Sequence, residues 1–483
     1  MNRLRKFLAA ALALFGISCG WGAKPSAAVP DEHKALSIYQ IMVASFQHSP
    51  EGAPGYSAMW GPDGHTKNGN LRGITEALDT IAALGVNAIW LTPVFDSSQA
   101  IGGEKLQATG YFTNDYFRID PHFGTDSEFR ELVDSAHARG LYVILDGVFG
   151  HHGGVKSPSP SGAVLDTVWT ESDRPDGGLG NVRYPASLDY IKDVATYYIR
   201  EYGIDGWRLD QAYQAMQGGH NYWLEIREAV EQAAHERREN GEHWGTLAYM
   251  VGEDWGDAAR INQGVYSQGG LLSAFDFDGK ERISGEMQSL DSEGLENSWH
   301  DVEIVLSSPS RRGYLNDTVA PNLFLSNHDG YRLADHFDPA DPNYYGKIKT
   351  RFAILAAYSG PITLYYGDEY ADRSAETEGG QKDNIARTSG HLEPRNAQER
   401  DLRDYVARAM RFRAENPAMY RGTPDFTRIL NGSADAELVV KTDLVTGSRV
   451  AIVFSDGDTR VTLPDGRNID VKAWTPEFVV LEY

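Results

Sequence analysis

The sequence predicts an α/β protein, a (β/α)8 TIM barrel with a short inserted domain after the third strand and a small C-terminal all-β domain. From Leu36 onward, runs rich in Val, Ile, Leu and Tyr alternate with amphipathic stretches. This alternation is typical of parallel strands that helices cover on both faces. Four of the runs end in carboxylates, at the position where the βα loops of a barrel meet and carry its active site.

The apolar runs predict eight strands, as many as a closed barrel requires. An example of a helix between them is the stretch that Asp126 opens and Gly140 closes, since Asp favours helix N-caps and Gly ends helices. The expected strands are Ser37–Val43, Asn87–Leu91, Leu141–Asp146, Ile204–Leu209, Leu247–Gly252, Leu271–Phe275, Asn322–Ser326 and Ile362–Tyr366.

The chain divides into a barrel and two smaller parts. The barrel takes residues 36–415, and the 483 residues suffice for a barrel of roughly 250 residues or more plus one further domain. Residues 152–188 are rich in Gly, Ser, Pro and Asp and exceed a usual βα loop, which predicts an inserted small domain. Residues 416–483 contain short β-patterned runs and form the expected all-β domain.

The N-terminus has the form of an export signal. In residues 1–18, basic side chains precede the apolar run Phe7–Ile17, which is too short to span a bilayer. Residues 19–35 are rich in Gly, Pro and Ala and read as a flexible tether.

Cys19, the only cysteine, follows the apolar run directly. The sequence Gly16-Ile17-Ser18-Cys19 resembles the lipobox of bacterial lipoproteins. We therefore expect an exported protein that is lipid-anchored at Cys19 in the bacterial envelope, in the periplasm or at the outer membrane. Secretion as a soluble protein, cut after Ala28, is the alternative. No other stretch is expected to contact a membrane.

The charge balance restricts the partners. The chain has 45 Lys+Arg against 68 Asp+Glu, a net charge of −23, which disfavours nucleic acid and anionic membrane surfaces. An uncharged substrate such as a sugar is compatible with this charge. The 10 Trp and 25 Tyr residues also suit the apolar faces of sugar rings, although most aromatic side chains are expected in the core.

Three strand-end carboxylates suggest one catalytic centre. Arg208 and Asp210 lie two residues apart on one strand and share a face, so Arg208 is expected to hold Asp210 ionised, as a nucleophile requires. Glu253 ends an apolar run, where burial and a neighbouring carboxylate raise the pKa of a general acid. Asp329, next to His328, can stabilise positive charge. The alternative is that each carboxylate forms a structural ion pair at a strand end. Three such carboxylates together, however, fit the catalytic groups of retaining glycoside hydrolysis.

The motifs that carry these residues resemble, in order, those of the α-amylase family of glycoside hydrolases. They are Asp146-Gly147-Val148-Phe149-Gly150-His151, GWRLD ending at Asp210, VGE ending at Glu253, and Phe324-Leu325-Ser326-Asn327-His328-Asp329. The likeness runs from about Leu36 to Arg387. It implies that Asp210 is the nucleophile, Glu253 the acid/base and Asp329 the stabiliser of the transition state.

The same resemblance implies sugar contacts. His151 and His328 would bind hydroxyls of the sugar next to the scissile bond, and Tyr111 would stack on its ring. Arg208 would also bind the substrate, and the structural Asp146 would lie close by. Asp383 and Arg387 would hold the next sugar, with a surface ion pair as the alternative. Tyr213 and Gln214 stand where the family has Lys and His on the leaving-group side. These two residues suggest that the protein acts on small oligosaccharides or transfers glycosyl groups. The alternative is neutral sequence drift with no effect on function.

Gly150 replaces the asparagine that ligates a calcium ion in the family, and glycine has no side-chain oxygen. The sequence therefore establishes no cofactor, and it leaves open whether the protein binds calcium.

These observations predict a retaining enzyme that cleaves α-1,4-glucosidic bonds in starch-derived maltooligosaccharides. A 4-α-glucanotransferase, a cyclomaltodextrinase and an exo-acting α-glucosidase are the alternatives within the family. A non-catalytic glucan-binding protein is the remote alternative.

Overall fold

The computed structural model describes residues 29–62, 67–100, 102–155, 157–168, 180–284, 296–375, 384–432 and 434–482. The expected signal peptide, Cys19 and Asp383 lie outside these ranges.

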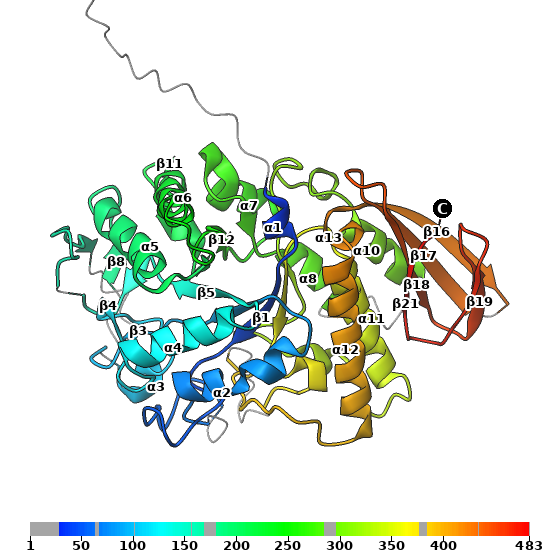
Figure 1. Ribbon diagram of the computed structural model, residues 1–483, viewed down its shortest axis with the longest axis horizontal. Helices are drawn as coiled ribbons and strands as arrows, with labels where there is room; N and C mark the ends of the chain where they lie inside the picture. Colours follow the sequence, from blue (N-terminus) through cyan, green and yellow to red (C-terminus); the bar gives the residue numbers. More distant parts are fainter. Residues whose placement is uncertain are drawn as a thin grey trace, which may run out of the picture.

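Eight parallel strands form the centre of the fold (Figure 1). They are β1 (Ser37–Ile41), β2 (Ala88–Leu91), β5 (Tyr142–Gly147), β9 (Gly206–Leu209), β12 (Tyr249–Gly252), β13 (Ser273–Ala274), β14 (Leu323–Phe324) and β15 (Ile362–Tyr365). Their order is β13-β12-β9-β5-β2-β1-β15-β14. A parallel bridge between Phe275 and Asn322 joins the two outermost strands and closes the ring. The predicted (β/α)8 barrel is confirmed, with each strand inside its predicted run or within one residue of it.

Helices connect the strands and cover the outside of the barrel. The longer ones are α2 (Leu71–Ala82), α4 (Asp126–His137), α5 (Leu188–Tyr202), α6 (Trp223–Glu239), α8 (Phe277–Ser284), α10 (Glu296–Leu306), α11 (Tyr344–Ala357) and α12 (Ala397–Glu415). The short ones are α1 (Asp31–Lys34), α3 (Glu104–Gln107), α7 (Ala258–Ile261) and α13 (Ala418–Arg421). The N-cap of α4 is Thr125 rather than Asp126, because Thr125 and Glu128 form a reciprocal capping box.

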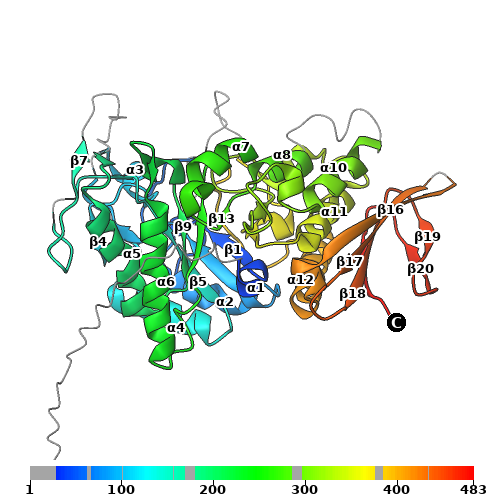
Figure 2. The same ribbon diagram turned by 90° about the horizontal axis from the view of Figure 1, so that it is seen from above.

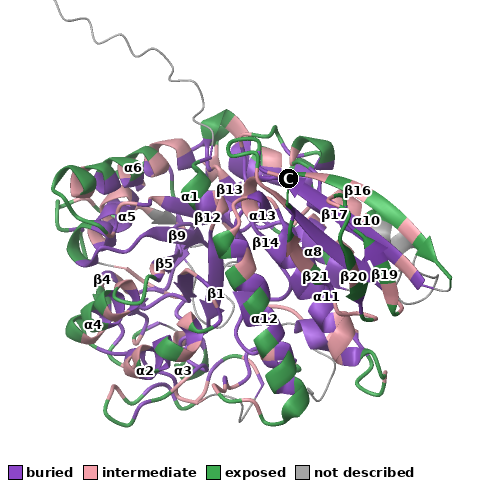
Figure 3. Cartoon of the chain, turned by 45° about the vertical axis from the view of Figure 1, so that its right-hand side comes forward, coloured by how far each residue is buried: buried purple, intermediate pink, exposed green. Residues whose placement is uncertain are grey.

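The barrel has two apolar layers. Side chains that point into the barrel form one cluster, which includes Ile38, Trp90, Ile144 and Tyr249. The opposite faces of the strands pack against the helices in a larger cluster. Figure 3 shows the strands buried and the outer helix faces exposed. The strands are therefore covered on both sides, and their charged residues gather at the carboxyl ends.

The expected insertion after the third strand contains a small antiparallel sheet, β6 (His151–His152), β8 (Gly180–Val182) and β7 (Thr167–Val168). A two-stranded sheet, β3 (Phe95–Asp96) with β4 (Asp115–Ile119), was not expected. Its register is irregular and β3 has two residues, too few for the alternation that marks a strand in a sequence.

The C-terminal domain is all-β (Figure 2). Its main sheet contains β16 (Thr423–Asn431), β17 (Ala434–Thr442), β18 (Arg449–Ser455) and β21 (Glu477–Val480), and β19 (Thr459–Thr462) pairs with β20 (Asn468–Val471). The sheet packs against the barrel, where the buried Lys441 Nζ donates to the carbonyl of Ala357 at 2.5 Å. The β structure begins at Thr423 rather than at residue 416, because α13 continues the helical part.

The described chain starts in contact with the barrel. Val29 and His33 are buried, and His33 Nε2 lies 2.9 Å from the carbonyl oxygen of Leu247. Residues 29–35 are therefore part of the fold, and the expectation of a flexible tether through residue 35 is wrong for them. Among the described residues, no helix combines the length and hydropathy needed to cross a bilayer.

Candidate active site

Three carboxylates line one cavity at the carboxyl ends of the barrel strands. Asp210 follows β9, Glu253 follows β12 and Asp329 lies five residues beyond β14. The cavity has a volume of about 540 Å³. Its lining consists of Trp60, Leu106, Thr109, Tyr111, Phe112, His151, Asp210, Gln211, Tyr213, Glu253, Trp255, Arg260, His328, Asp329, Asn384 and Arg387. The closure of the barrel thus brings together residues from most of the chain.

Arg208 lies beneath the carboxylates and is 1% exposed. Its Nη1 is 2.9 Å from Asp210 Oδ1 and 2.8 Å from Asp146 Oδ1, and its Nη2 is 2.5 Å from Glu253 Oε1. One guanidinium therefore orients three carboxyl groups from three neighbouring strands. Asp210 Oδ2, which Arg208 does not hold, faces His151 Nε2 at 3.8 Å.

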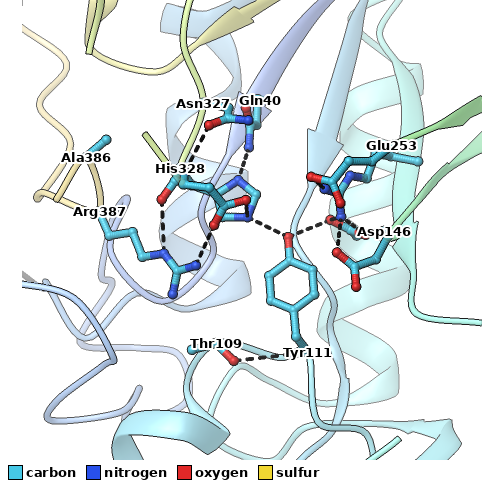
Figure 4. Close-up of polar contacts among 12 residues, drawn as sticks. Gln40, Thr109, Tyr111, Asp146, Glu253, Asn327, His328, Ala386 and Arg387 are labelled. Carbon is cyan, nitrogen blue, oxygen red and sulfur yellow. Dashed lines mark hydrogen bonds and ion pairs between the residues drawn. The ribbon is translucent and has the colours of Figure 1, made fainter. Parts of the chain in front are cut away.

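Asp329 is held on the opposite side of the cavity. Arg387 Nη2 donates to Asp329 Oδ1 at 2.8 Å, and Arg387 Nε donates to the carbonyl of His328 at 3.1 Å. His328 Nε2 lies 3.3 Å from Asp329 Oδ2. Arg387 thus ties the loop after β15 to the loop after β14 (Figure 4).

Tyr111 connects the two sides (Figure 4). Its hydroxyl donates to Asp146 Oδ2 at 2.8 Å and lies 2.8 Å from His328 Nε2. The amide of Gln40 lies 2.7 Å from His328 Nδ1, so Gln40 donates and the ring proton of His328 sits on Nε2. The result is a chain of hydrogen bonds with one direction, from Gln40 through His328 and Tyr111 to Asp146.

The three carboxyl groups that line the cavity differ in their pKa values. Burial, opposed by Arg208, raises the pKa of Asp210 to about 6, and burial raises the pKa of Glu253 to about 7. Burial also acts on Asp329, but His328 and the guanidiniums of Arg387 and Arg208 outweigh it and hold the pKa of Asp329 below its ordinary value. At neutral pH, Asp329 and most of Asp210 are ionised while Glu253 retains a proton in a large part of the molecules. The pKa of Glu253 is raised, as the sequence predicts.

The other predicted site residues differ in where they lie relative to the cavity. Tyr111, His151, His328 and Arg387 line the cavity, as does Tyr213, which is 39% exposed. Arg208 and Asp146 lie below the cavity, behind the carboxylates, so Arg208 does not line the cavity as a substrate-binding residue would. Gln214 does not line the cavity; its amide contacts His151 and Gln211 instead. Asp383 falls outside the described residues.

Sequence reasoning missed several residues of the site. Gln40 lies in β1, and an amide inside an apolar strand is a signal that could have identified it. Trp255 is 52% exposed, and its indole Nε1 donates to Glu253 Oε1 at 3.1 Å; its place two residues after Glu253 is a second usable signal. Trp60, 47% exposed, lies in a loop whose sequence carries no comparable pattern.

The surroundings of Gly150 do not fit the calcium site that the resemblance implies. A Cβ atom on residue 150 would lie 1.8 Å from Gln214 Oε1, so Gln214 already fills the space that a ligating side chain would need. Within the described ranges, no three His, Cys, Asp or Glu side chains gather as a metal site requires. Residue 150 itself therefore offers no side-chain ligand for the ion, and Gln214 occupies the place of one.

Comparison with known proteins agrees with this geometry. The sequence profile of the family described as Alpha amylase, catalytic domain, matches residues 40–158 and 181–423. A cyclomaltodextrinase of Geobacillus thermopakistaniensis (strain MAS1) is 30% identical over 429 residues, which cover 82% of this chain and 65% of that protein. An intracellular maltogenic amylase of Bacillus subtilis (strain 168) is 29% identical over 373 residues, 70% of this chain and 56% of that protein. The chain thus spans less than two thirds of the length of these two relatives.

Among solved structures, a variant of AmyP in complex with maltotriose is 32% identical and superposes with a TM-score of 0.77, over 93% of this chain and 98% of that one. AmyP in complex with maltose superposes with a TM-score of 0.76 at the same identity. The profile match covers most of the barrel, from residue 40 onward, and reaches the first residue of the C-terminal sheet, and the motif order agrees with it. The chain belongs to the α-amylase family.

Proposed function

We propose that this protein hydrolyses α-1,4-glucosidic bonds in maltooligosaccharides with retention of the anomeric configuration. Asp210 is the nucleophile, Glu253 the general acid and base, and Asp329 the group that stabilises the positively charged transition state. The family membership and the names of the relatives support the substrate class.

The observation that carries the proposal is the contact of Asp210 and Glu253 with one guanidinium. Arg208 reaches both carboxyl groups through its two terminal nitrogens, which keeps them close together. Retaining hydrolysis needs its two carboxyl groups about 5–5.5 Å apart, whereas inversion needs a wider gap for a water molecule. Both carboxyl groups on one guanidinium fit the closer spacing, and the family membership supports a double displacement.

In the first step, Asp210 Oδ2 attacks the anomeric carbon, since Oδ1 is held by Arg208. The bond from this carbon to the glycosidic oxygen breaks, and the proton of Glu253 passes to that oxygen as the leaving sugar departs. Positive charge develops on the ring, and the ionised Asp329 stabilises it. The product of this step is a glycosyl ester of Asp210.

In the second step, Glu253 is ionised and acts as a base. It takes a proton from a water molecule, whose oxygen bonds to the anomeric carbon while the ester bond to Asp210 breaks. Glu253 then carries its proton again and Asp210 its charge. A sugar hydroxyl in place of the water molecule would give transglycosylation by the same step.

The leaving-group side offers aromatic surfaces to a sugar. Tyr213 and Trp255 are exposed aromatic side chains of the cavity lining, and sugars can stack on such faces. A cyclomaltodextrinase-type activity on short or cyclic maltodextrins is the second candidate, because relatives with that name match 70–82% of this chain at 28–30% identity.

Product analysis tests the proposal. Maltoheptaose is incubated with the full chain, and proton NMR follows the anomeric configuration of the first products. We expect maltose and other short sugars that appear first as α-anomers. Inverted β-anomers would refute the retaining mechanism, and chains longer than maltoheptaose would establish a glucanotransferase. Glucose as the only product would establish an exo-acting α-glucosidase. Binding of maltotriose without turnover would leave only the glucan-binding alternative.

We further propose that the protein is exported and anchored by a lipid on Cys19. The basic start, the short apolar run and the single cysteine support this. Labelling of bacterial cells with a fatty-acid probe is expected to mark the full-length protein but not a Cys19→Ser variant. An unlabelled wild-type protein in the culture medium would favour soluble export instead.

A further inference from the structure

The loop that follows Asp210 is held by glutamine side chains. Gln211 adopts a left-handed backbone conformation with φ 43° and leads into a 3₁₀ turn, Ala212–Ala215. Inside this turn, the backbone N–H of Gln214 donates to the carbonyl of Gln211 at 2.9 Å. The amide of Gln217 donates to the carbonyl of Gln214 at 3.0 Å and to that of Val182 at 2.8 Å. Gln217 thereby links the turn to β8 of the inserted domain.

The side chain of Gln214 points back toward the third strand and fills the space beside Gly150. A Cβ on residue 150 would lie 1.8 Å from Gln214 Oε1 and 2.5 Å from Gln214 Cβ. Real Cβ atoms do not approach other atoms so closely, so Gln214 in this position requires glycine at 150. The two residues form a complementary pair across the site.

The hydrogen bonds of Gln214 set the direction of its amide. Its Nε2 donates to Gln211 Oε1 at 3.0 Å, and the hydroxyl of Tyr213 donates to the same oxygen at 2.7 Å. Gln214 Oε1 is then left to face His151 Nδ1 at 3.2 Å. An amide oxygen only accepts hydrogen bonds, so His151 must carry its proton on Nδ1.

The tautomer has a consequence for the substrate. With the proton on Nδ1, the neutral His151 ring presents the lone pair of Nε2 to the cavity, 3.8 Å from Asp210 Oδ2. Two acceptors then flank the same point, and a sugar hydroxyl there can donate to Nε2 without drawing on the nucleophile. The opposite tautomer would place an N–H group beside Asp210 and reduce its nucleophilicity.

We infer that Gln214 is a positioning residue that fixes this tautomer of His151 and, together with Gly150, replaces a structural metal ion beside the nucleophile. Gln211, Gln214 and Gln217 connect His151, the turn after Asp210 and β8 of the inserted domain by hydrogen bonds alone. The site then keeps its shape without calcium. The catalytic consequence rests on the proposed function; the tautomer and the metal independence do not.

The tautomer is tested by NMR on the full chain labelled with ¹⁵N-histidine. The ring signals of His151 are assigned by their loss in a His151→Gln variant. We expect Nδ1 to be protonated and Nε2 to be unprotonated at neutral pH. In Gln214→Met, which keeps the side-chain volume but removes the acceptor, we expect a mixture of tautomers. A protonated Nε2 in the wild-type protein, or no change in Gln214→Met, would overturn the inference.

Kinetics on maltotriose separates positioning from simple structural support. In Gln214→Met we expect kcat/KM to fall about five- to tenfold, the effect of one lost hydrogen bond, with a Tm close to that of the wild type. Gln232→Met, on the exposed face of α6, is the matched control and should change neither. An unchanged kcat/KM in Gln214→Met would refute the positioning role.

Thermal unfolding tests the metal-free loop and needs no turnover. The Tm of the wild-type chain is expected to be the same in calcium chloride and in EDTA. Gly150→Asn should lower the Tm because it collides with Gln214, and adding Gln214→Ala in the same chain should restore part of the loss. A calcium-dependent Tm of the wild type, or no recovery in the double variant, would contradict the replacement of the metal.

Discussion

Asp146 and Arg208 are register partners on the neighbouring parallel strands β5 and β9, and their side chains meet with Asp146 Oδ1 2.8 Å from Arg208 Nη1. This pair sits below Asp210 and sets the position of the guanidinium that Asp210 and Glu253 share. Asp146 is fully buried and also accepts from Trp90 Nε1 at 3.2 Å and from the hydroxyl of Tyr111. The cation of the site is therefore anchored by the barrel wall and not by the substrate.

Removal of this cation should change the pH dependence of both activity and stability. In Arg208→Met, the carboxyl groups lose the cation that favours their charged forms, so the pKa values of Asp210 and Glu253 should rise by about 1–3 units. At pH 8 the variant should unfold at a clearly lower temperature, because its folded state must then keep protons on Asp210 and Glu253 that the unfolded chain has released. Near pH 5 these two groups are protonated in the folded state with or without Arg208, so the loss should be smaller.

Arg208→Lys keeps the charge and serves as the control for this prediction, with a smaller loss of Tm at pH 8. Calorimetry at both pH values makes the comparison. An equal loss at pH 5 and pH 8 in Arg208→Met would show that packing, and not charge, dominates.

Glu253→Gln should abolish most of the turnover. The amide cannot donate the proton that the leaving sugar needs, and general acid catalysis contributes about 10²–10⁴-fold. We expect kcat on maltotriose to fall by this factor, while binding, measured by calorimetry, persists. Glu239→Gln on the exposed end of α6 is the matched control. Normal turnover in Glu253→Gln would refute the assignment of Glu253 as the general acid.

The plot of kcat/KM against pH should be bell-shaped. Asp210 must be ionised and its pKa is about 6, so kcat/KM should fall as the pH drops below that value. Glu253 must be protonated and its pKa is about 7, so kcat/KM should fall as the pH rises above it. Rates of maltotriose hydrolysis from pH 4 to pH 9 provide the measurement. A rate still increasing at pH 9 would exclude Glu253 as the acid.

Tyr213 should govern the leaving-group side. It is exposed at the cavity, and the guanidinium of Arg260 lies over its ring at 5.2 Å. Arg260 in turn is held by the buried Asp254 at 2.5 Å. Tyr213→Ala should raise the KM for maltotriose several-fold and reduce transglycosylation at high sugar concentration.

A substrate with an aryl leaving group in place of sugars is the control for the Tyr213→Ala variant. Its hydrolysis should change less than that of maltotriose, since no leaving sugar contacts Tyr213. Equal effects on both substrates would show that Tyr213 positions Asp210 and does not bind the leaving group.

Glu437 should destabilise the protein at alkaline pH. It is fully buried in β17, and its two carboxyl oxygens have no hydrogen-bond partner among the described residues. Burial raises the pKa of Glu437 from 4.5 to about 7. The folded state therefore holds this proton more tightly than the unfolded chain, and stability falls as the pH rises toward and through 7.

Replacing Glu437 with Gln should thus raise the free energy of unfolding at pH 8 by about 1–3 kcal/mol and have little effect below pH 4.5. Glu415→Gln, at the exposed end of α12, is the control. Denaturant unfolding at the two pH values measures the difference. A variant that is stabilised equally at both would point to packing instead of ionisation.

The sequence predicted much of the fold and the carboxylates of the site, because both depend on local patterns. A buried strand needs a continuous apolar run, and a carboxylate directly after such a run lies at the strand's carboxyl end. The eight runs and the residues Asp210, Glu253 and Asp329 could therefore be identified in order along the chain. The short sheet β3–β4 and the folded segment 29–35 escaped prediction, since both are stabilised by contacts with distant segments.

The sequence by itself thus determined which strands form and which charged residues stand at their ends. Only the tertiary structure decided which polar side chains contact each other. Gln40 reaches His328, 288 residues further along the chain, and Arg208 joins carboxyl groups from three strands. Gln214 turns away from the cavity to the space beside Gly150. The physical reason is that hydrophobic periodicity acts over a few residues, whereas the direction of a polar side chain depends on the partners that barrel closure brings within hydrogen-bond distance.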